Sequence, residues 1–343
     1  MWYLAIISLI IFLFLSLLVL YKVKENYQFA AKLIIWLCLL LFVAITCTLS
    51  KDYVNYEIMF NNALNNIITN EISFFLISKI ISVFSQSVWF VFIVYAFLSV
   101  TIKFHAIKKL SQFFFPSLLV YYSYYFFLHE ITQIRAAVSA SFILMCIIEI
   151  VKSDFKKFLL FSILASFFHY SAIIILPFYF LKRNKIQNFY YFLVPVGFII
   201  FLTGYNLTSL IGLIDIQYIK IKYETYLKMA SFEKINVFNV TEIFRYIFCY
   251  LLLWKWKYIY EKTPYAVIVI KIYIFSVFSL LAFADIPTIA FRISELLGIT
   301  EIIAIPYLIY LVKYEAFKKI ITPAISFYFL FIVIVYENLL KLF

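Results

Sequence analysis

Apolar segments long enough to cross a lipid bilayer recur along the whole of this 343-residue chain. The hydrocarbon core of a bilayer is roughly 30 Å thick, so a helix needs about 20 mostly apolar residues to cross it. With 66% hydrophobic and 13% charged residues, the chain has too few polar side chains to cover the water-exposed surface of a soluble domain. The sequence therefore predicts an all-α polytopic membrane protein with a single integral-membrane domain over residues 1–343.

The apolar segments predict about ten transmembrane helices. Their positions are 1–21, 30–49, 87–103, 113–129, 131–151, 188–204, 243–260, 264–283, 293–312 and 320–340. Because Lys and Arg collect in cytoplasmic loops, the basic clusters place both termini on the periplasmic side. The mixed-charge stretch 205–242 alone departs from this pattern. This stretch and residues 50–86 form outer loops that we expect to carry interfacial helices.

The segment 158–181 does not fit one ordinary crossing, because basic residues lie at both of its ends. Lys156–Lys157 precede it and Lys182–Arg183 follow it. A re-entrant pair of half-helices that turns near His169–Ser171 keeps both ends in the cytoplasm. Irregular backbone of this kind is tolerated in a membrane where protein or a wet cavity surrounds it. The alternative is a single crossing helix with an exposed basic end.

Charge and composition argue against several other classes of protein. The net charge of +12 would indicate nucleic-acid binding in a soluble protein, but basic cytoplasmic loops explain it here, so no nucleic-acid partner is expected. The four cysteines lie singly in apolar segments and the three histidines are far apart, so no disulfide framework, metal centre or cofactor is expected. Transporters that unwind helices rely on Gly and Pro, and four glycines are few for one.

Arg135 is the most informative of the polar residues that this topology places at outer helix ends. An Arg just inside an apolar segment is costly, so it should face a cavity or a partner rather than lipid. Thr132, Arg135 and Ser139 follow i, i+3, i+7 spacing, which gives one polar stripe on a helix. The planar guanidinium suits phosphate oxygens and favours anion binding. The alternative is a structural ion pair with Glu130 or Asp285.

Other polar residues at the outer ends are weaker candidates. His169 either holds the tip of the re-entrant pair together or contacts a substrate. Arg292 and Glu295 share a helical face at i, i+3 and form either a surface ion pair or part of a substrate site. Asp52 is a loop carboxylate, and most such residues are simply solvated. None of these residues identifies an activity by itself.

Several short motifs together resemble a known family. They are Gln133–Ala137, the pair Lys156–Lys157, the run Leu164–Ala172, the stretch Asp52–Tyr56 and Arg292. Over residues 50–310 they resemble the EpsG-like family of polysaccharide polymerases, which overlaps with the Wzy-type O-antigen polymerases. The plan of an outer-loop Asp, an interfacial helix and a later re-entrant pair also resembles the GT-C glycosyltransferases, which implies a GT-C-like arrangement. The family often has Arg-Gln where this chain has Gln133-Ile134-Arg135-Ala136, so the neighbour that assists Arg135 stays open.

The resemblance implies an enzyme of the bacterial inner membrane whose active site faces the periplasm. Such an enzyme transfers the growing glycan of an O-antigen or exopolysaccharide from undecaprenyl pyrophosphate to the sugar of an incoming lipid-linked repeat unit, as in lipopolysaccharide biosynthesis. Its partners would be these lipid-linked oligosaccharides, the lipid bilayer and a chain-length regulator protein. The alternatives are a GT-C enzyme that adds one sugar from a lipid-phosphate donor and, less favoured, a lipid-linked oligosaccharide flippase. A flippase needs polar groups along a path through the membrane, whereas here they gather near one face.

Roles for individual residues follow from the resemblance. Arg135, together with Arg292, would bind the donor pyrophosphate, because fixed cations stabilise the charge of a leaving group. Asp52 is the first candidate for the base that accepts the proton of the acceptor hydroxyl, and His169 is the alternative. Four further substrate-binding candidates are Gln133, Glu130, Tyr53 and Tyr56.

Overall fold

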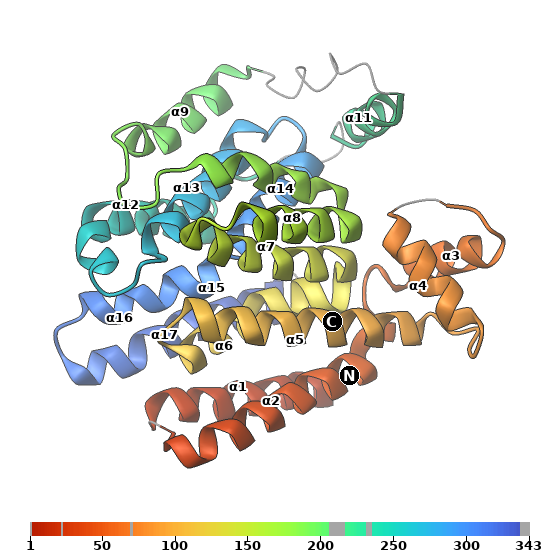
Figure 1. The fold of residues 1–343 in the computed structure, drawn as a ribbon, viewed down its shortest axis with the longest axis horizontal. Coiled ribbons are helices and arrows are strands. Elements are labelled where there is room, and N and C mark those ends of the chain that lie inside the picture. Colours follow the sequence, from red (N-terminus) through yellow and green to blue (C-terminus); the bar gives the residue numbers. More distant parts are fainter. Residues whose placement is uncertain (1, 22, 69–70, 206–216, 231–234, 337–343) are drawn as a thin grey trace. The chain divides into compact units, whose positions relative to one another are not determined.

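The computed structural model describes residues 2–21, 23–68, 71–205, 217–230 and 235–336. Within these residues the regular secondary structure is helical and includes no strand (Figure 1). The chain falls into two compact units. The all-α prediction is confirmed, whereas the single integral-membrane domain stays a prediction.

The first unit combines Met1–Ile175 with Glu301–Phe343. Its helices are α1 (Trp2–Leu20), α2 (Glu25–Thr46), η1 (Cys47–Leu49), α3 (Tyr53–Leu64), α4 (Ile72–Ser82), α5 (Trp89–Leu110), α6 (Phe114–Val120), η2 (Tyr121–Thr132), α7 (Ile134–Lys152), α8 (Phe155–Phe168), α15 (Glu301–Ala304), η4 (Ile305–Tyr307), α16 (Leu308–Leu311), α17 (Glu315–Phe331) and η5 (Ile332–Tyr336). Helix α7 packs against both α5 and α8 (Figure 1). Because small and aliphatic residues cover all of its faces, α7 is buried along most of its length.

The second unit is Leu176–Thr300. It contains α9 (Tyr190–Thr203), α11 (Gln217–Ala230), α12 (Val240–Tyr260), α13 (Ala266–Ala282) and α14 (Pro287–Gly298). Helix α13 lies at its centre and packs against α9, α12 and α14. Gly197 lets α9 approach α13 closely, since a Cβ atom at this position would lie 2.9 Å from the Cβ atom of Leu281.

Six helical segments in the described part of the chain are long and apolar enough to cross a membrane. They are Tyr3–Leu20, Glu25–Leu49, Trp89–Leu110, Ile134–Lys152, Pro287–Leu311 and Glu315–Val335, and each overlaps a predicted span. The other predicted spans lack one long apolar helix. Segment 113–129 divides into α6 and the π-helical η2, α9 and α13 have 14 and 17 residues, and α12 carries several charges. Ten spans, the GT-C-like arrangement and periplasmic termini therefore stay predictions.

The segment predicted to be re-entrant breaks where the sequence places its turn. Helix α8 ends at Phe168, His169 is extended with φ −154° and ψ 113°, and the 3₁₀-helix η3 (Tyr170–Phe180) follows. At 1.5 Å per α-helical residue and 2.0 Å per 3₁₀ residue, α8 and η3 are each about 21–22 Å long. Both are too short to cross roughly 30 Å of hydrocarbon alone. That the two halves re-enter the membrane from one side stays a prediction.

The two predicted outer loops contain helices. Helices α3 and α4 occupy most of residues 50–86 and pack against each other. Their apolar faces bury Tyr56, Phe60 and Phe74. In the loop 205–242, α11 is described, whereas 206–216 and 231–234 lie outside the described residues. The interfacial placement of these helices stays a prediction.

Candidate active site

Glu71 is a buried carboxylate at the centre of a polar cluster in the first unit. It immediately precedes α4, has extended backbone dihedrals, and is 5% exposed. Its carbonyl oxygen accepts the backbone N–H of Phe74 at 3.1 Å, which begins the helix. A helix N-terminus favours a negative charge, because the first N–H groups have no partner within the helix and the peptide dipoles align. The local fold therefore stabilises an ionised side chain at this position.

Arg135 meets this carboxylate from α7. The backbone of Gln133, with φ −103° and ψ 56°, separates η2 from α7, so a new helix starts at Ile134 and Arg135 lies in its first turn. The guanidinium forms an ion pair with Glu71 Oε2 through Nη1. Its central carbon lies 5.7 Å from the ring centre of Tyr56 on α3. Arg135 thus faces a buried partner, through an ion pair of the kind given as the alternative from sequence but with Glu71 instead of Glu130 or Asp285, and its anion-binding role stays a prediction.

His169 meets the other oxygen of the same carboxylate. Its Nδ1 lies 2.9 Å from Glu71 Oε1, and the imidazole is largely buried. The backbone N–H of His169 donates to Ala165 at 2.9 Å, and its carbonyl accepts the N–H of Ala172 at 2.9 Å. His169 therefore ends α8 and starts η3 while its side chain reaches Glu71. The break in the helix positions the imidazole.

The two partners control the protonation of Glu71. Burial alone would raise the pKa of this carboxyl, but the hydrogen bond with His169 and the charge of Arg135 outweigh burial and lower the pKa to about 2. Glu71 is thus an anion at neutral pH. Arg135 is a cation, so the pair carries no net charge, and the charge of the cluster depends on the protonation of His169.

Aromatic side chains surround the cluster. Tyr56 stacks on Phe74 with ring centres 5.7 Å apart and meets the edge of Phe92 at 5.3 Å. Tyr95 of α5 contacts Phe168 at 5.7 Å. Burial raises the pKa of Tyr56 although Arg135 opposes this effect, so its hydroxyl keeps its proton. These apolar surroundings lower the local dielectric constant, which strengthens every electrostatic interaction within the cluster.

Asp52 immediately precedes α3, where its carbonyl accepts the N–H of Tyr56 at 3.0 Å, and Tyr53 is the first residue of the helix. Asp52 is half-buried, its Oδ1 accepts a long hydrogen bond of 3.5 Å from Asn55, and its charge raises the pKa of Tyr56. Tyr53 stacks on Phe92 at 5.6 Å. The structure therefore brings Arg135, His169 and Tyr56 into one cluster and places Asp52 just before the helix that carries Tyr56.

Glu130 lies in a different buried ion pair of the first unit. Its Oε1 is 2.7 Å from Lys103 Nζ and accepts the hydroxyl hydrogen of Tyr121 at 2.7 Å. Lys103 also donates to Ser99 Oγ at 2.6 Å and to the Ala137 carbonyl at 2.9 Å. All of the contacts of the Glu130 carboxylate fall on Oε1, while the buried Oε2 has no hydrogen-bond partner among the described residues. These contacts give Glu130 an internal partner, and its role in substrate binding stays a prediction.

Arg292 belongs to α14 in the second unit. It donates to the hydroxyl of Tyr226 on α11 at 2.5 Å, and its guanidinium carbon lies 5.1 Å from the centre of that ring. Arg292 is half-exposed. Its predicted pairing with the donor pyrophosphate is not tested by these contacts.

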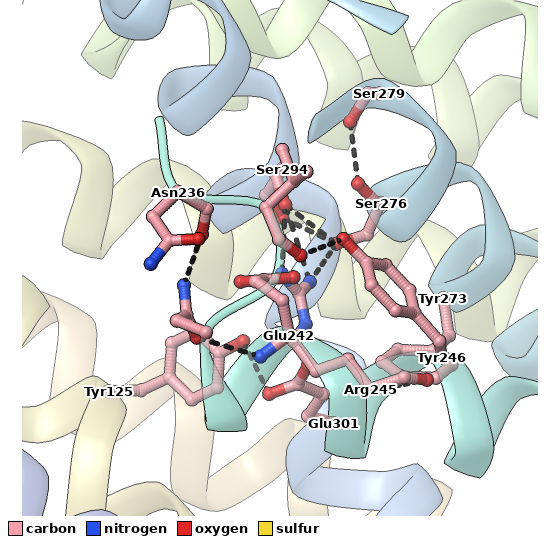
Figure 2. A network of polar contacts seen from close by, with 12 residues as sticks. Tyr125, Asn236, Glu242, Arg245, Tyr246, Tyr273, Ser276, Ser279, Ser294 and Glu301 are labelled. Carbon is pink, nitrogen blue, oxygen red and sulfur yellow. Dashed lines mark hydrogen bonds and ion pairs between the residues drawn. The ribbon is translucent and has the colours of Figure 1, made fainter. Parts of the chain in front are cut away.

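The second unit also contains a buried arginine, Arg245, that the sequence analysis did not single out. Arg245 of α12 lies 3.1 Å from Glu242 and donates to Ser276 of α13 at 2.7 Å and to Ser294 of α14 at 3.3 Å (Figure 2). It joins three helices through one side chain. The rule that identified Arg135, an Arg inside an apolar segment, applies equally to Arg245 and would have found it.

Among the residues of the candidate site itself, Glu71 was missed. The sequence shows it only as an acidic residue before a short amphipathic helix, where a solvated side chain is the ordinary expectation. Its contacts come from residues 64 and 98 positions away in the sequence, and no local pattern indicates them. Among the described residues, no three His, Cys, Asp or Glu side chains converge in a way that could hold a metal ion.

The chain is helical, with several helices apolar enough to cross a membrane, and it encloses a polar cluster of Glu71, Arg135 and His169. These features define a membrane protein with an internal polar site. Comparison with known proteins defines the family. The chain belongs to the EpsG family, which it matches over residues 29–341. It is similar to the amylovoran biosynthesis protein AmsC of Erwinia amylovora, at 22% identity over 277 residues that cover 78% of this chain and 72% of the relative. No solved structure matches this chain.

These findings confirm the family resemblance that the motifs indicated. Family and relative together point to polymerisation of exopolysaccharide or O-antigen repeat units, which is an activity of the glycosyltransferase type. Several long apolar helices agree with a multi-pass membrane protein.

Proposed function

We propose that this protein is a periplasm-facing polymerase of the bacterial inner membrane that joins O-antigen or exopolysaccharide repeat units. It would transfer the growing glycan from undecaprenyl pyrophosphate to the sugar of an incoming lipid-linked repeat unit. Membership of the EpsG family supports the reaction class. One structural observation supports the site: Arg135 and His169, from different helices, converge on a single buried carboxylate.

The reaction needs a base and a stabilised leaving group. The acceptor hydroxyl oxygen attacks the anomeric carbon of the growing glycan and forms the new glycosidic bond. The bond between that carbon and the pyrophosphate oxygen breaks, and undecaprenyl pyrophosphate leaves with the electron pair. The hydroxyl proton passes to the base. General-base catalysis of this kind contributes about 10²–10⁴-fold, and electrostatic stabilisation of the leaving group contributes a similar factor.

The contacts favour His169 as the base. With Nδ1–H donating to Glu71, Nε2 is the ring nitrogen that accepts a proton. The neighbouring anion then stabilises the imidazolium that forms. Asp52, the first choice from sequence, is half-buried and accepts a long hydrogen bond from Asn55. Asp52 remains the alternative base.

Arg135 fits the role of pyrophosphate ligand. Glu71 occupies Nη1, while the buried Nε atom of Arg135 has no partner among the described residues. A buried donor without a partner is costly, and an anionic ligand would satisfy it. The N-terminus of α7 also favours a bound anion. In this proposal Arg292 is a second cation for pyrophosphate, and Gln133, Glu130, Tyr53 and Tyr56 contact the substrates.

Reconstitution tests the proposal directly. Purified protein in lipid nanodiscs is given the lipid-linked repeat unit, the product lengths are resolved on a gel, and released undecaprenyl pyrophosphate is measured. We expect a ladder of products from the wild type. Arg135→Lys keeps the charge but loses the planar fork, so turnover should fall about 100-fold. The matched control Arg245→Lys, at the other buried Glu–Arg pair, should retain near-normal turnover. A normal ladder from Arg135→Lys would contradict the role of Arg135.

A deletion strain separates the proposal from its alternatives. Single capped repeat units indicate a lost polymerase. Absence of the surface glycan indicates a flippase, and a full-length ladder that lacks one branch indicates a single-sugar transferase. The expected chain-length regulator would change the distribution of product lengths when it is added to the reconstituted polymerase.

A further inference from the structure

We propose that Glu71 is a positioning residue that joins the base and the cation of the active site into one unit. Its carboxylate orients His169 for proton transfer and holds Arg135 beside it. This inference rests on the polymerase function proposed above, and it adds to that proposal a residue whose role is distinct from binding substrate.

Each oxygen of the Glu71 carboxylate contacts one partner. Oε1 lies 2.9 Å from His169 Nδ1, and Oε2 pairs with Arg135 Nη1. The distance between base and cation is therefore set by one rigid, planar group. Catalytic groups must be held to within a fraction of an ångström of their productive positions, and buried neighbouring partners of this kind are what hold them.

The helices explain why Glu71 can perform this role. It precedes α4, Arg135 lies in the first turn of α7, and His169 follows α8, so each side chain starts from the end of a helix. Helix ends fix the backbone of these residues while leaving their side chains to point away from the helices. Glu71 is 5% exposed, which removes competition from water for both of its partners.

Glu71 is itself a poor proton acceptor. Its pKa of about 2 means that about one molecule in 10⁵ carries the proton at pH 7. A group that stays ionised serves instead as a fixed negative charge. It favours the Nδ1–H tautomer of His169 and stabilises the imidazolium after the acceptor hydroxyl has lost its proton, as the carboxylate of a catalytic triad does.

The ionisable groups around His169 determine how its protonation depends on pH. Those in the cluster come from five neighbouring elements and are Glu71 before α4, Arg135 on α7, His129 on η2, Tyr95 on α5, and Tyr56 on α3 with Asp52 just before it. Glu71 hydrogen-bonds directly to the imidazole and favours its cationic form, whereas Arg135 disfavours it. Removal of the Glu71 charge leaves the Arg135 charge unopposed. His169 should then keep its proton only at lower pH.

The experiment compares pH–rate profiles of the reconstituted polymerase. Turnover of the lipid-linked repeat unit at saturating concentration is measured between pH 5 and pH 9 for the wild type and for Glu71→Gln, which has the same shape but no charge. We expect maximal turnover to fall by at least about tenfold, with the acidic limb of the profile moving about one pH unit lower. KM should change less than turnover, since Glu71 does not contact the substrate.

Glu149→Gln is the matched control. Glu149 is a buried carboxylate on α7, the same helix as Arg135, and it pairs with Lys152 at 3.2 Å. If removal of any buried charge lowers turnover, both variants should lose turnover. If Glu71 acts through His169, the acidic limb of the pH–rate profile should move for Glu71→Gln alone. Monodisperse gel filtration establishes that each variant is folded.

The outcomes separate this inference from the proposed function. A wild type that makes no polymer overturns the function itself. An active wild type with an unshifted acidic limb for folded Glu71→Gln overturns the role of Glu71 alone. If Glu71→Gln does not fold, Glu71→Asp carries the test. Its carboxylate is about 1.5 Å shorter in reach and cannot hold both partners, so a smaller shift of the limb is expected and an unchanged profile again overturns the proposal.

Discussion

Glu71, Arg135 and His169 stabilise one another because each provides the opposite charge or hydrogen bond that water would provide at an exposed site. A buried anion or cation is costly without a partner, and one that is paired and hydrogen-bonded is tolerated. Here one carboxylate satisfies a guanidinium and an imidazole at once. The cluster therefore depends on all three side chains, and removal of any one leaves an uncompensated group.

Substitution of the two candidate bases distinguishes them at the residue scale. His169→Asn should lower turnover by about 10²–10⁴-fold, because a positioned general base contributes a factor of that size. Asp52→Asn should lower it by less than about tenfold, since in this proposal the base is His169, which contacts Glu71 directly. Turnover of the reconstituted polymerase provides the measurement. The reverse order of effects would identify Asp52 as the base.

The low pKa of Glu71 predicts a loss of stability in acid. The pKa is about 2 in the folded protein against an ordinary value of 4.5, so the stabilisation is fully present above about pH 4.5 and disappears as the pH falls through about 2. The lowered pKa contributes about 3 kcal/mol to the free energy of unfolding at neutral pH, and about 2 kcal/mol of this contribution should be lost by pH 3. The free energy of unfolding in detergent, compared between pH 7 and pH 3, should therefore fall more for the wild type than for Glu71→Gln. Equal losses for both proteins would count against the ion pair.

At the scale of elements, the sequence predicted helices well and their ends less well. The apolar segments located α1, α2, α5, α7 and α17, because a bilayer imposes one length on every crossing helix. The basic residues around 158–181 indicated a broken segment with a turn near His169–Ser171, and the structure has the break at His169. The π-helical η2 and the short α9 were not foreseen, since apolar content does not reveal how a helix is wound or where it stops.

Two glycines of α9 and its C-terminal end, Gly197 and Gly204, differ in how closely neighbouring helices approach them, and this predicts different effects of substitution by Ala. Gly197→Ala should destabilise the protein by about 1–3 kcal/mol, because the added Cβ atom would meet Leu281 Cβ at 2.9 Å, where no flexible side-chain end can yield. Gly204 has a φ of +65° and a Cβ atom added there would meet nothing within 4 Å, so Gly204→Ala adds only backbone strain of about 1 kcal/mol. Thermal unfolding in detergent compares the two. A smaller loss for Gly197→Ala than for Gly204→Ala would show that α9 and α13 can separate freely.

At the scale of the whole molecule, the site was partly predictable. Arg135 and His169 were identified because an arginine and a helix break are unusual inside apolar sequence. Glu71 was not, since the residues that contact it are 64 and 98 positions away in the sequence. Long-range contacts of this kind follow from how the helices pack, and a single sequence does not specify that packing.

Labelling of introduced cysteines decides between a re-entrant pair and a single crossing at 158–181. Lys156 and Lys185 are both exposed and lie on either side of the break at His169. In a Cys38→Ser background, Lys156→Cys and Lys185→Cys are each treated with a membrane-impermeant maleimide in spheroplasts and in broken cells, with the exposed Lys51→Cys as the periplasmic control. Because positive residues favour the cytoplasm, we expect Lys51→Cys to react in spheroplasts and the other two to react only after lysis. If Lys185→Cys also reacts in spheroplasts, α8 and η3 form one crossing, and His169 lies within the membrane rather than at an outer tip.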